Sequence, residues 1–337
     1  MHLHRALTMH RQALPRRPQA GFSMVELMVA LAIGLIVSMA VMMGYLGAAQ
    51  SQRGQSDLSR MQETSRFAFD LFGRETRNAA YRDNTQTKTS PRLCFGPGIA
   101  GQACQTSVPY LYAFNDATSP TLSDGTTPTI LNHGDVVTFR YYGMDSVNLS
   151  TGVKTGNADG SILNCTGTGV AYAMLNEDSI YIARDTTNTT NDPAGEPTLY
   201  CSSRQQVAGV WSSPTVVPLI PGVESLQILY GEDIPITSNN NSPDGVVDHY
   251  VIPANLKSAD LTLVKSLMVS VVVRSPSTSG NTASASLASF NIFNHFGRDY
   301  APADAAPSGD AGSVFSAPGD GRLRRVYNTL FAVRNAL

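Results

Sequence analysis

One carboxylate stands at the start of the longest apolar run in this sequence. Residues 27–49 carry no charged side chain, and Glu26 directly precedes them. A carboxylate that enters a bilayer without a partner is energetically expensive, so an acid in such a place is a functional residue whose partner has to be found. The chemistry that it predicts is charge pairing in an apolar environment.

Four cysteines form the second candidate set. Cys94, Cys104, Cys165 and Cys201 all follow the apolar run, form no C-x-x-C pair and have no histidine pair at zinc spacing. In an exported region, an even number of cysteines predicts disulfides, and four cysteines allow three connectivities. We favour Cys94–Cys104 with Cys165–Cys201 because each pair closes the shorter loop; buried free thiols are the alternative.

The stretch NNNSPDGVVDHY is similar to the first half of a calcium-binding loop. Asn240, Asp244 and Asp248 would supply oxygen ligands, and Gly245 would allow a sharp turn. The twelfth position of the pattern, however, holds a valine instead of a bidentate acid. We therefore favour a turn built from Asn, Pro, Asp and Gly, and we expect neither a metal nor another cofactor.

The histidines of this sequence do not form a pattern typical of catalysis. After residue 21 the histidines are His133, His249 and His295, each isolated from the others. There is no G-x-S-x-G, no P-loop and no H-E-x-x-H motif. We expect no enzymatic activity.

Basic residues near the C-terminus could bind an acidic partner or a nucleic acid. Because they are scattered along an alternating, strand-like segment, we interpret them as a solvated strand face: Arg322, Arg324, Arg325 and Arg334. The lone Trp211 is interpreted as core or strand-edge packing. Net charge also argues against nucleic acid, since 20 basic residues face 26 acidic ones once the four arginines of residues 1–21 are set aside.

The apolar run is the clearest of the elements that must position these residues. A helix of 23 residues spans about 35 Å, enough to cross a bilayer core. A cleaved secretory signal has a shorter apolar region of about 7–15 residues with a small-residue site after it, whereas here Gly21 precedes the run. The arginines of residues 1–21 place the N-terminus in the cytoplasm and the later residues on the far side, where disulfides persist.

Periodicity predicts that this helix continues well beyond the membrane. We expect one helix over residues 22–80, with a transmembrane half at 22–49 and an amphipathic half at 50–80. The predicted stripe that packs on the globular domain follows a 3-4-3-4 spacing: Leu58, Met61, Ser65, Ala68 and Phe72. Charged residues are expected on the other faces: Arg60, Glu63, Arg66, Asp70, Arg74 and Glu75.

The remaining residues, 81–337, are predicted to form an exported globular domain rich in antiparallel β-strands. Only 15% of the residues are charged, and a composition rich in Ser, Thr, Asn, Gly and Pro suits short strands and long polar loops. The strand-like segments are residues 134–143, 178–184, 197–203, 216–233, 263–275 and 324–335. The fold class is therefore α+β, with a long N-terminal helix packed on an antiparallel sheet domain.

The segment GFSMVELMVALAIGLIVSMAVMM resembles the N-terminal signature of class III-signal prepilins, the type IV pilins and type II secretion pseudopilins. That signature is a basic leader ending in glycine, then phenylalanine, three mostly apolar residues, glutamate and a long apolar run; Gly21, Phe22 and Glu26 match it. The resemblance implies that a prepilin peptidase removes residues 1–21 and that Phe22 becomes an N-methylated N-terminus. It also implies that Glu26 pairs with the amino group of Phe22 on a neighbouring subunit, which would offset the burial cost of both charges.

The order of the later segments is similar to the PilW group of minor pilins: VESLQILYGED, DGVVDHYV, LVKSLMVSVVVRS and RRVYNTLFAVRN. The implied function is a minor type IV pilin, a structural subunit that helps to initiate or prime pilus polymerisation. Its partners would be other minor pilins, the major pilin, the prepilin peptidase and the inner-membrane assembly machinery. It would span the inner membrane once, with a periplasmic C-terminal domain, and then join the filament near its tip.

Two alternatives remain open at this point. A type II secretion minor pseudopilin shares the N-terminal signature. An exported adhesin or enzyme on a plain membrane anchor belongs to a different class, and it would retain residues 1–21.

Overall fold

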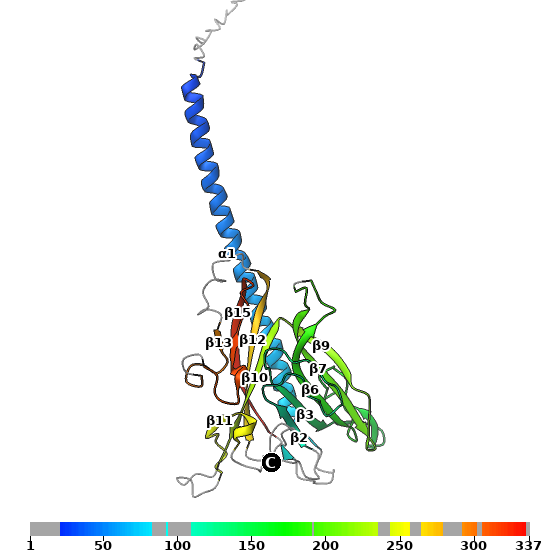
Figure 1. The fold of residues 1–337 in the computed structure, drawn as a ribbon. Coiled ribbons are helices and arrows are strands. Elements are labelled where there is room, and N and C mark those ends of the chain that lie inside the picture. Colours follow the sequence, from blue (N-terminus) through cyan, green and yellow to red (C-terminus); the bar gives the residue numbers. More distant parts are fainter. Residues whose placement is uncertain are drawn as a thin grey trace, which may run out of the picture. The chain divides into compact units, whose positions relative to one another are not determined.

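The computed structural model of this chain separates into two units, residues 1–52 and 53–337, each of which is described by itself. The described residues are 21–82, 92–93, 109–190, 192–234, 243–256, 264–278, 292–301 and 305–334. One long helix, α1 (Met24–Asn78), contributes residues to both units (Figure 1).

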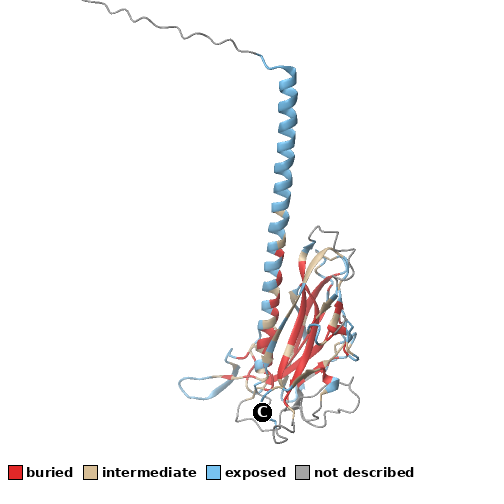
Figure 2. Ribbon diagram, turned by 90° about the vertical axis from the view of Figure 1, so that its left-hand side faces the viewer, coloured by how far each residue is buried: buried red, intermediate tan, exposed pale blue. Residues whose placement is uncertain are grey.

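The first unit is the apolar part of α1. Ser23 precedes the helix, and its Oγ accepts a hydrogen bond from the Val25 backbone N–H at 3.2 Å, as an N-capping serine does. The apolar side chains that follow are exposed on every face of the helix (Figure 2). By length and composition, α1 is the one helix among the described residues that could cross a membrane.

The second half of α1 packs on the β domain through the predicted stripe, with one exception. Met61, Ser65, Ala68 and Phe72 are buried, as their spacing predicts, but Leu58 is 41% exposed. Its neighbour Asp57 is buried instead, because its Oδ2 accepts a 2.6 Å hydrogen bond from the hydroxyl of Ser277. The prediction was therefore wrong for Leu58, at the N-terminal end of the stripe, where the buried residue is its neighbour Asp57.

The C-terminal end of α1 is hydrogen-bonded to strand β3 (Val136–Tyr142). Ala80 has a φ of +61°, a left-handed conformation typical of helix C-termini. Its N–H donates to the carbonyl of Arg140 at 2.9 Å, and the Tyr142 N–H donates to the carbonyl of Tyr81 at 2.8 Å. These two bonds fix the end of α1 to the sheet.

The larger sheet has seven strands, in the order β1-β2-β3-β6-β7-β8, with β9 also paired to β7. Its pairs are antiparallel except for β1–β2. Besides β3, the strands are β1 (Arg92–Leu93), β2 (Pro109–Phe114), β6 (Leu175–Asp185), β7 (Glu196–Val207), β8 (Val210–Trp211) and β9 (Thr215–Pro221).

The smaller sheet is antiparallel and has four strands in the order β11-β10-β12-β15. They are β10 (Val223–Glu232), β11 (His249–Val251), β12 (Val264–Thr278) and β15 (Arg322–Ala332). Two two-stranded antiparallel sheets pair β4 (Asp145–Val147) with β5 (Lys154–Ala158), and β13 (Ile292–Asn294) with β14 (Val314–Ser316). The described residues also include two short 3-10 helices, η2 (Pro253–Asn255) and η7 (Ala311–Ser313).

One hydrophobic core joins the second half of α1 to both sheets. Phe72 of the helix, Ile180 of β6 and Val271 of β12 are all fully buried in it. Each predicted strand segment overlaps an observed strand or strand pair. The α+β fold with a long N-terminal helix is therefore confirmed, with the β domain built from two principal sheets.

Candidate functional sites

The N-terminal motif lies entirely in the first unit. Gly21 and Phe22 precede the helix, and Glu26 lies in its first turn, where the helix dipole favours an acid. The side chains of Phe22 and Glu26 are exposed. The apolar side chains after Glu26 are not buried by other residues of this unit. Because exposure of apolar surface to water is unfavourable, this surface requires lipid or other apolar helices.

A disulfide joins Cys165, in the loop before β6, to Cys201 on β7, with a Cα–Cα distance of 6.4 Å. Both residues are buried. The backbone N–H of Cys165 also donates to Asp178 Oδ2 at 2.8 Å, which fixes the loop to β6. Cys94 and Cys104 lie outside the described residues, so their pairing stays a prediction.

Beside this disulfide, an acid of the helix is buried against an acid of the sheet. Glu75 was expected on an exposed face of α1, and that prediction was wrong, because its side chain is fully buried. Burial and the neighbouring carboxylate of Asp178 raise the pKa of Glu75 well above its usual range. Arg74, 3.2 Å from Glu75 Oε1, lowers the pKa without outweighing these two effects. The Tyr141 hydroxyl donates to Asp178 Oδ2 at 2.6 Å.

The hydrogen bonds around this pair indicate where the proton lies. Glu75 Oε2 and Asp178 Oδ1 are both buried, and no donor group reaches either atom. A proton on Glu75 would satisfy both atoms at once, with Glu75 donating to Asp178. The raised pKa of Glu75 favours its neutral form, and we interpret the pair as a contact in which Glu75 donates to Asp178 and ties the last turn of α1 to β6.

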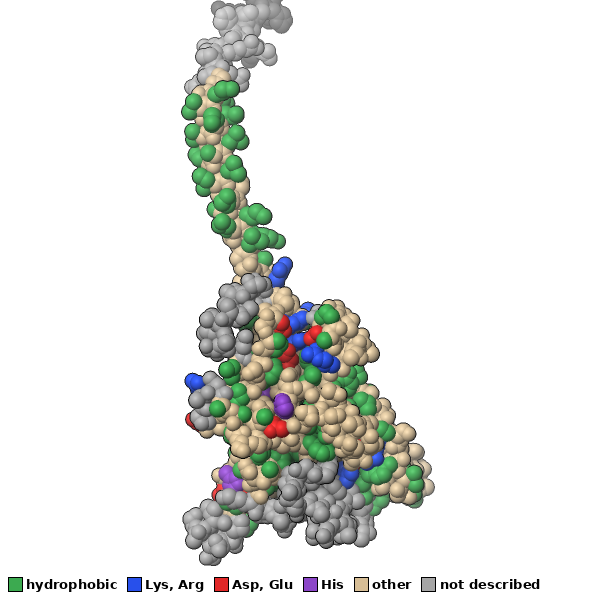
Figure 3. Space-filling model, viewed as in Figure 1, with side chains coloured by type: hydrophobic (Ala, Val, Ile, Leu, Met, Phe, Trp, Pro, Cys, Tyr) green, Lys and Arg blue, Asp and Glu red, His purple; other side chains and the backbone are tan. Residues whose placement is uncertain are grey.

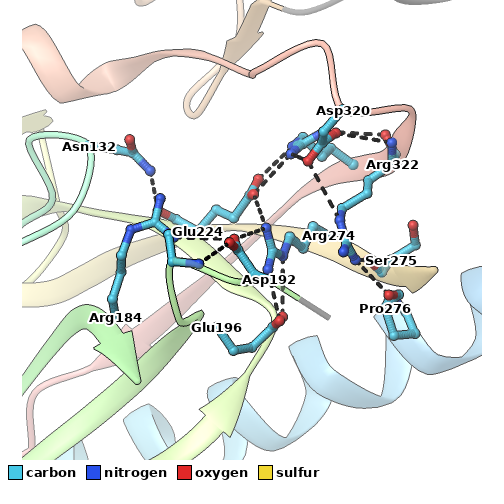
Figure 4. Close-up of polar contacts among 12 residues, drawn as sticks. Asn132, Arg184, Asp192, Glu196, Glu224, Arg274, Ser275, Pro276, Asp320 and Arg322 are labelled. Atoms are coloured by element: carbon cyan, nitrogen blue, oxygen red, sulfur yellow. Dashed lines mark hydrogen bonds and ion pairs between the residues drawn. The ribbon is translucent and has the colours of Figure 1, made fainter. Parts of the chain in front are cut away.

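A cluster of ion pairs links the two sheets (Figure 4). Arg274 of β12 contacts Glu196 of β7 at 2.8 Å and Glu224 of β10 at 3.3 Å. On β15, Arg324 contacts Glu224 at 3.0 Å and Asp320 at 2.7 Å. The side chains of Arg274, Glu196, Glu224 and Arg324 are each at most 4% exposed.

This cluster corrects the interpretation of the C-terminal arginines as a solvated face. Arg322 and Arg324 have side chains only 9% and 3% exposed, and both reach Asp320. Burial alone would lower the pKa of Arg274, but Glu196 and Glu224 raise it, so the guanidinium stays charged. Arg325 and Arg334 are exposed, so the interpretation holds for these two.

Trp211 packs at a strand edge, as predicted, but its partners are charged. The guanidinium carbon of Arg204 lies 4.2 Å from the ring centroid, and that of Arg140 lies 5.7 Å from it. Both arginines also pair with the buried carboxylate of Glu177. The indole therefore caps an ion pair through cation–π contacts.

The histidines show no catalytic arrangement among the described residues. His295 is 1% exposed, and its two ring nitrogens lie 2.9 Å from the hydroxyls of Ser225 and Ser270. Burial lowers its pKa to about 3, so the ring is neutral. A neutral imidazole bridging two fully buried serines fixes a loop to the sheet and reaches no solvent-borne substrate.

The candidate calcium loop uses its described acids within the fold. Asp248 Oδ2 accepts the Ile234 N–H at 2.8 Å, and Asp244 Oδ1 accepts the Val246 N–H at 2.9 Å. Asn240 lies outside the described residues. These contacts are those of a closed turn, and calcium binding stays a prediction for titration to test.

A groove with a volume of about 1050 Å³ lies in the β domain between the second half of α1 and the β9–β10 turn. Its lining mixes arginines and acids with apolar side chains: Arg60, Glu63, Phe67, Asp70, Arg74, Leu219, Ile220 and Pro221 are among them. Acidic and basic side chains also lie intermixed on one face of the β domain in Figure 3.

Taken together, the motif and the fold define a class of protein. A Gly–Phe step, a glutamate at the head of an apolar helix and an antiparallel β domain on the second half of that helix are features of a type IV pilin-like chain. Sequence comparison agrees with this class. A family described as Type IV Pilus-assembly protein W matches residues 180–335, and the Prokaryotic N-terminal methylation motif matches residues 16–42. The chain is thus a type IV pilin-like protein with a PilW domain.

Other comparisons are more distant. Among solved structures, a type IV-like pilin from Thermus thermophilus is 13% identical, with a TM-score of 0.40, and the match covers 82% of this chain and 98% of that one. The search of curated proteins found no match. The matched family is one of structural pilus proteins, not of enzymes.

Proposed function

We propose that this chain is a minor type IV pilin, a structural subunit that helps to initiate or prime pilus polymerisation. The observation that carries the proposal is the presence of a methylation motif over residues 16–42 and a PilW match over residues 180–335 in one chain. The large domain at 81–337 favours a minor role, because it is bulky for a subunit that repeats along a whole filament. We propose no catalytic activity.

The N-terminal residues have assigned roles under this proposal. The prepilin peptidase removes the basic leader, residues 1–21, on the cytoplasmic side, and Phe22 becomes the methylated N-terminus. Glu26 then pairs with the amino group of Phe22 on a neighbouring subunit. The pairing is favourable because each charge relieves the burial cost of the other in an apolar filament core.

The remaining segments divide the work between membrane and filament. Residues 22–49 hold the subunit in the inner membrane and later pack in the filament core, and residues 50–80 carry the periplasmic domain. That domain supplies contacts with other minor pilins and the major pilin near the filament tip. The exposure of every apolar side chain between Leu27 and Leu46 supports this use of the helix.

Processing tests the class of protein directly. N-terminal mass analysis of the chain from its host should find a mature species that begins at methylated Phe22. A mature chain that still carries residues 1–21 would overturn the proposal and favour a plain anchored adhesin or enzyme.

Deletion and complementation test the role. Removing the gene should reduce surface pili, and the wild-type chain should restore them. Unchanged piliation together with a loss of protein secretion would instead assign the chain to the type II secretion pseudopilins.

A further inference from the structure

Among the described residues, β15 is an edge strand that pairs with β12 alone, and β13 lies near it without pairing. β15 (Arg322–Ala332) is 11 residues long and lies at the end of the order β11-β10-β12-β15 (Figure 1). Its register with β12 is continuous from Ala332 to Arg324. Within the described part of the chain, the backbone hydrogen bonds of residues 325–332 all go to β12. The opposite row of N–H and C=O groups therefore has no protein partner there.

The open edges of the domain differ in how they are protected. β9 (Thr215–Pro221), at an edge of the larger sheet, contains Pro218 and Pro221, which have no N–H to offer a new strand. β11 (His249–Val251), at the other end of the smaller sheet, has only three residues. β15 has neither protection, since it contains no proline, no glycine and no bulge over residues 324–332. Of these three edges, that of β15 is the best suited to receive a strand.

Side chains along this edge point to the chemistry of the strand. Leu330 is 54% exposed, and Asn328 and Arg325 are exposed as well. Arg325 lies 5.5 Å from the ring of Tyr327 and forms no ion pair among the described residues. Of the four arginines in residues 321–337, Arg322 and Arg324 have buried side chains that pair with Asp320, whereas Arg325 and Arg334 are exposed. An incoming strand thus meets a cationic edge with an apolar position beside it.

We propose that β15 is a docking edge that accepts an acidic β-strand of another pilus subunit, which extends the smaller sheet by one strand. Main-chain hydrogen bonds would supply the affinity, as in other cases of strand addition. An acidic side chain opposite Arg325 and an apolar one opposite Leu330 would supply the register. That the partner is a pilus subunit rests on the proposed function; the docking edge itself does not.

A second copy of this chain fits the edge poorly. Two copies joined edge to edge through β15 would bring together four exposed arginines, Arg325 and Arg334 of each chain. Like charges on adjacent strands are destabilising. The exposed Arg325 therefore rejects self-association while it attracts an acidic strand.

Site-specific photo-cross-linking of the full-length chain in its host cell tests the proposal. A photoreactive amino acid replaces Asn328 or Leu330 on β15, and Val216 on β9, which is 43% exposed, serves as the matched control. The β15 positions should cross-link to an acidic strand of a second protein, and the Val216 position should not. No cross-link at either β15 position, or one to a second copy of this chain, would overturn the proposal.

Charge reversal adds an independent readout. Arg325→Glu should lower the yield of the Leu330 cross-link by roughly three- to tenfold, because it replaces an attractive cross-strand pair with a repulsive one. Arg298→Glu reverses an exposed charge outside β15 and should leave the yield unchanged. An intact Cys165–Cys201 disulfide and unchanged Trp211 fluorescence would show that the variant is folded, and Arg325→Gln, with a smaller loss, provides a milder variant. Equal yields for wild type and both Arg325 variants would refute the charge argument.

The identity of the cross-linked protein separates the two proposals. A pilus subunit supports both. An acidic strand of an exported protein outside the pilus supports the docking edge and counts against the minor-pilin function.

Discussion

Replacing Glu75 with glutamine tests whether a neutral acid ties α1 to β6. Glutamine has the same shape as a protonated glutamate: its Oε1 can accept from Arg74, and its Nε2–H can donate to Asp178 Oδ1. In the wild type, the folded chain keeps a proton on Glu75 that the unfolded chain releases above the ordinary pKa of about 4.5. The variant has no such proton, so its stability lacks this dependence on pH.

The sign and size of the effect follow from proton linkage. Because the folded-state pKa of Glu75 is raised, its contribution is fully favourable below about pH 4.5 and is lost as pH rises towards the raised value. One proton released on unfolding lowers the free energy of unfolding of the wild type by about 1.4 kcal/mol per pH unit across that window. The advantage of Glu75→Gln over the wild type should therefore grow as the pH rises from about 4.5 towards the raised pKa of Glu75.

Urea unfolding of the full-length chain in detergent measures this difference. The chain has a single tryptophan, Trp211, so its fluorescence reports on the β domain alone. Asp135 and Asp310, whose pKa values burial also raises, titrate in both proteins and cancel in the comparison. Glu63→Gln, at an exposed position of the same helix, should show no such trend. Stability curves for wild type and Glu75→Gln that stay parallel over this range would refute the neutral-acid interpretation.

Four further outcomes are expected. Glu224→Gln should lower the free energy of unfolding by about 3–5 kcal/mol, because two buried guanidinium groups lose a carboxylate; a loss below about 1 kcal/mol in the same urea assay would contradict the cluster's role. Replacing both Cys165 and Cys201 with alanine should cost about 4 kcal/mol, as the chain-entropy estimate gives for a separation of 36 residues, and an unchanged urea midpoint would argue against it. Glu26→Ala should leave membrane insertion intact and reduce the amount of subunit in sheared pili, measured by immunoblot; normal incorporation would remove Glu26 from the docking role. Calorimetric titration with calcium should give no binding heat at the loop of residues 240–248, and a saturable signal would revive the calcium hypothesis.

Sequence reasoning succeeds here where a pattern is local. The 3-4-3-4 spacing identifies the buried stripe from Met61 to Phe72, because helical periodicity depends on neighbours within two turns. It could also have found Glu75, which lies three residues beyond Phe72 on the same stripe. The charge of Glu75 argued for an exposed face, and the partner that makes its burial tolerable, Asp178, is about a hundred residues away in the sequence.

The same limit explains the error on the C-terminal arginines. An alternating strand with several arginines is typical of a solvated face, and for Arg325 that interpretation holds. Arg324 is buried because Glu224 reaches it from β10, and Arg274 is buried because Glu196 reaches it from β7. No single segment contains the information that these carboxylates meet. The pairing follows from the register of three strands and from the contact between two sheets.

The two surfaces that this chain leaves for partners constrain assembly in different ways. Apolar packing along the exposed helix is nondirectional, and a run of similar side chains from Leu27 to Leu46 tolerates sliding along the helix axis. A charge pair at Glu26 would fix the axial position, because a buried carboxylate is costly everywhere except beside its partner. A strand edge is more selective still, since a slip of one residue moves every side chain of the incoming strand to the opposite face. If the β15 edge is occupied as proposed, it selects which subunit is the neighbour. The apolar helix and Glu26 then determine the axial position of that neighbour.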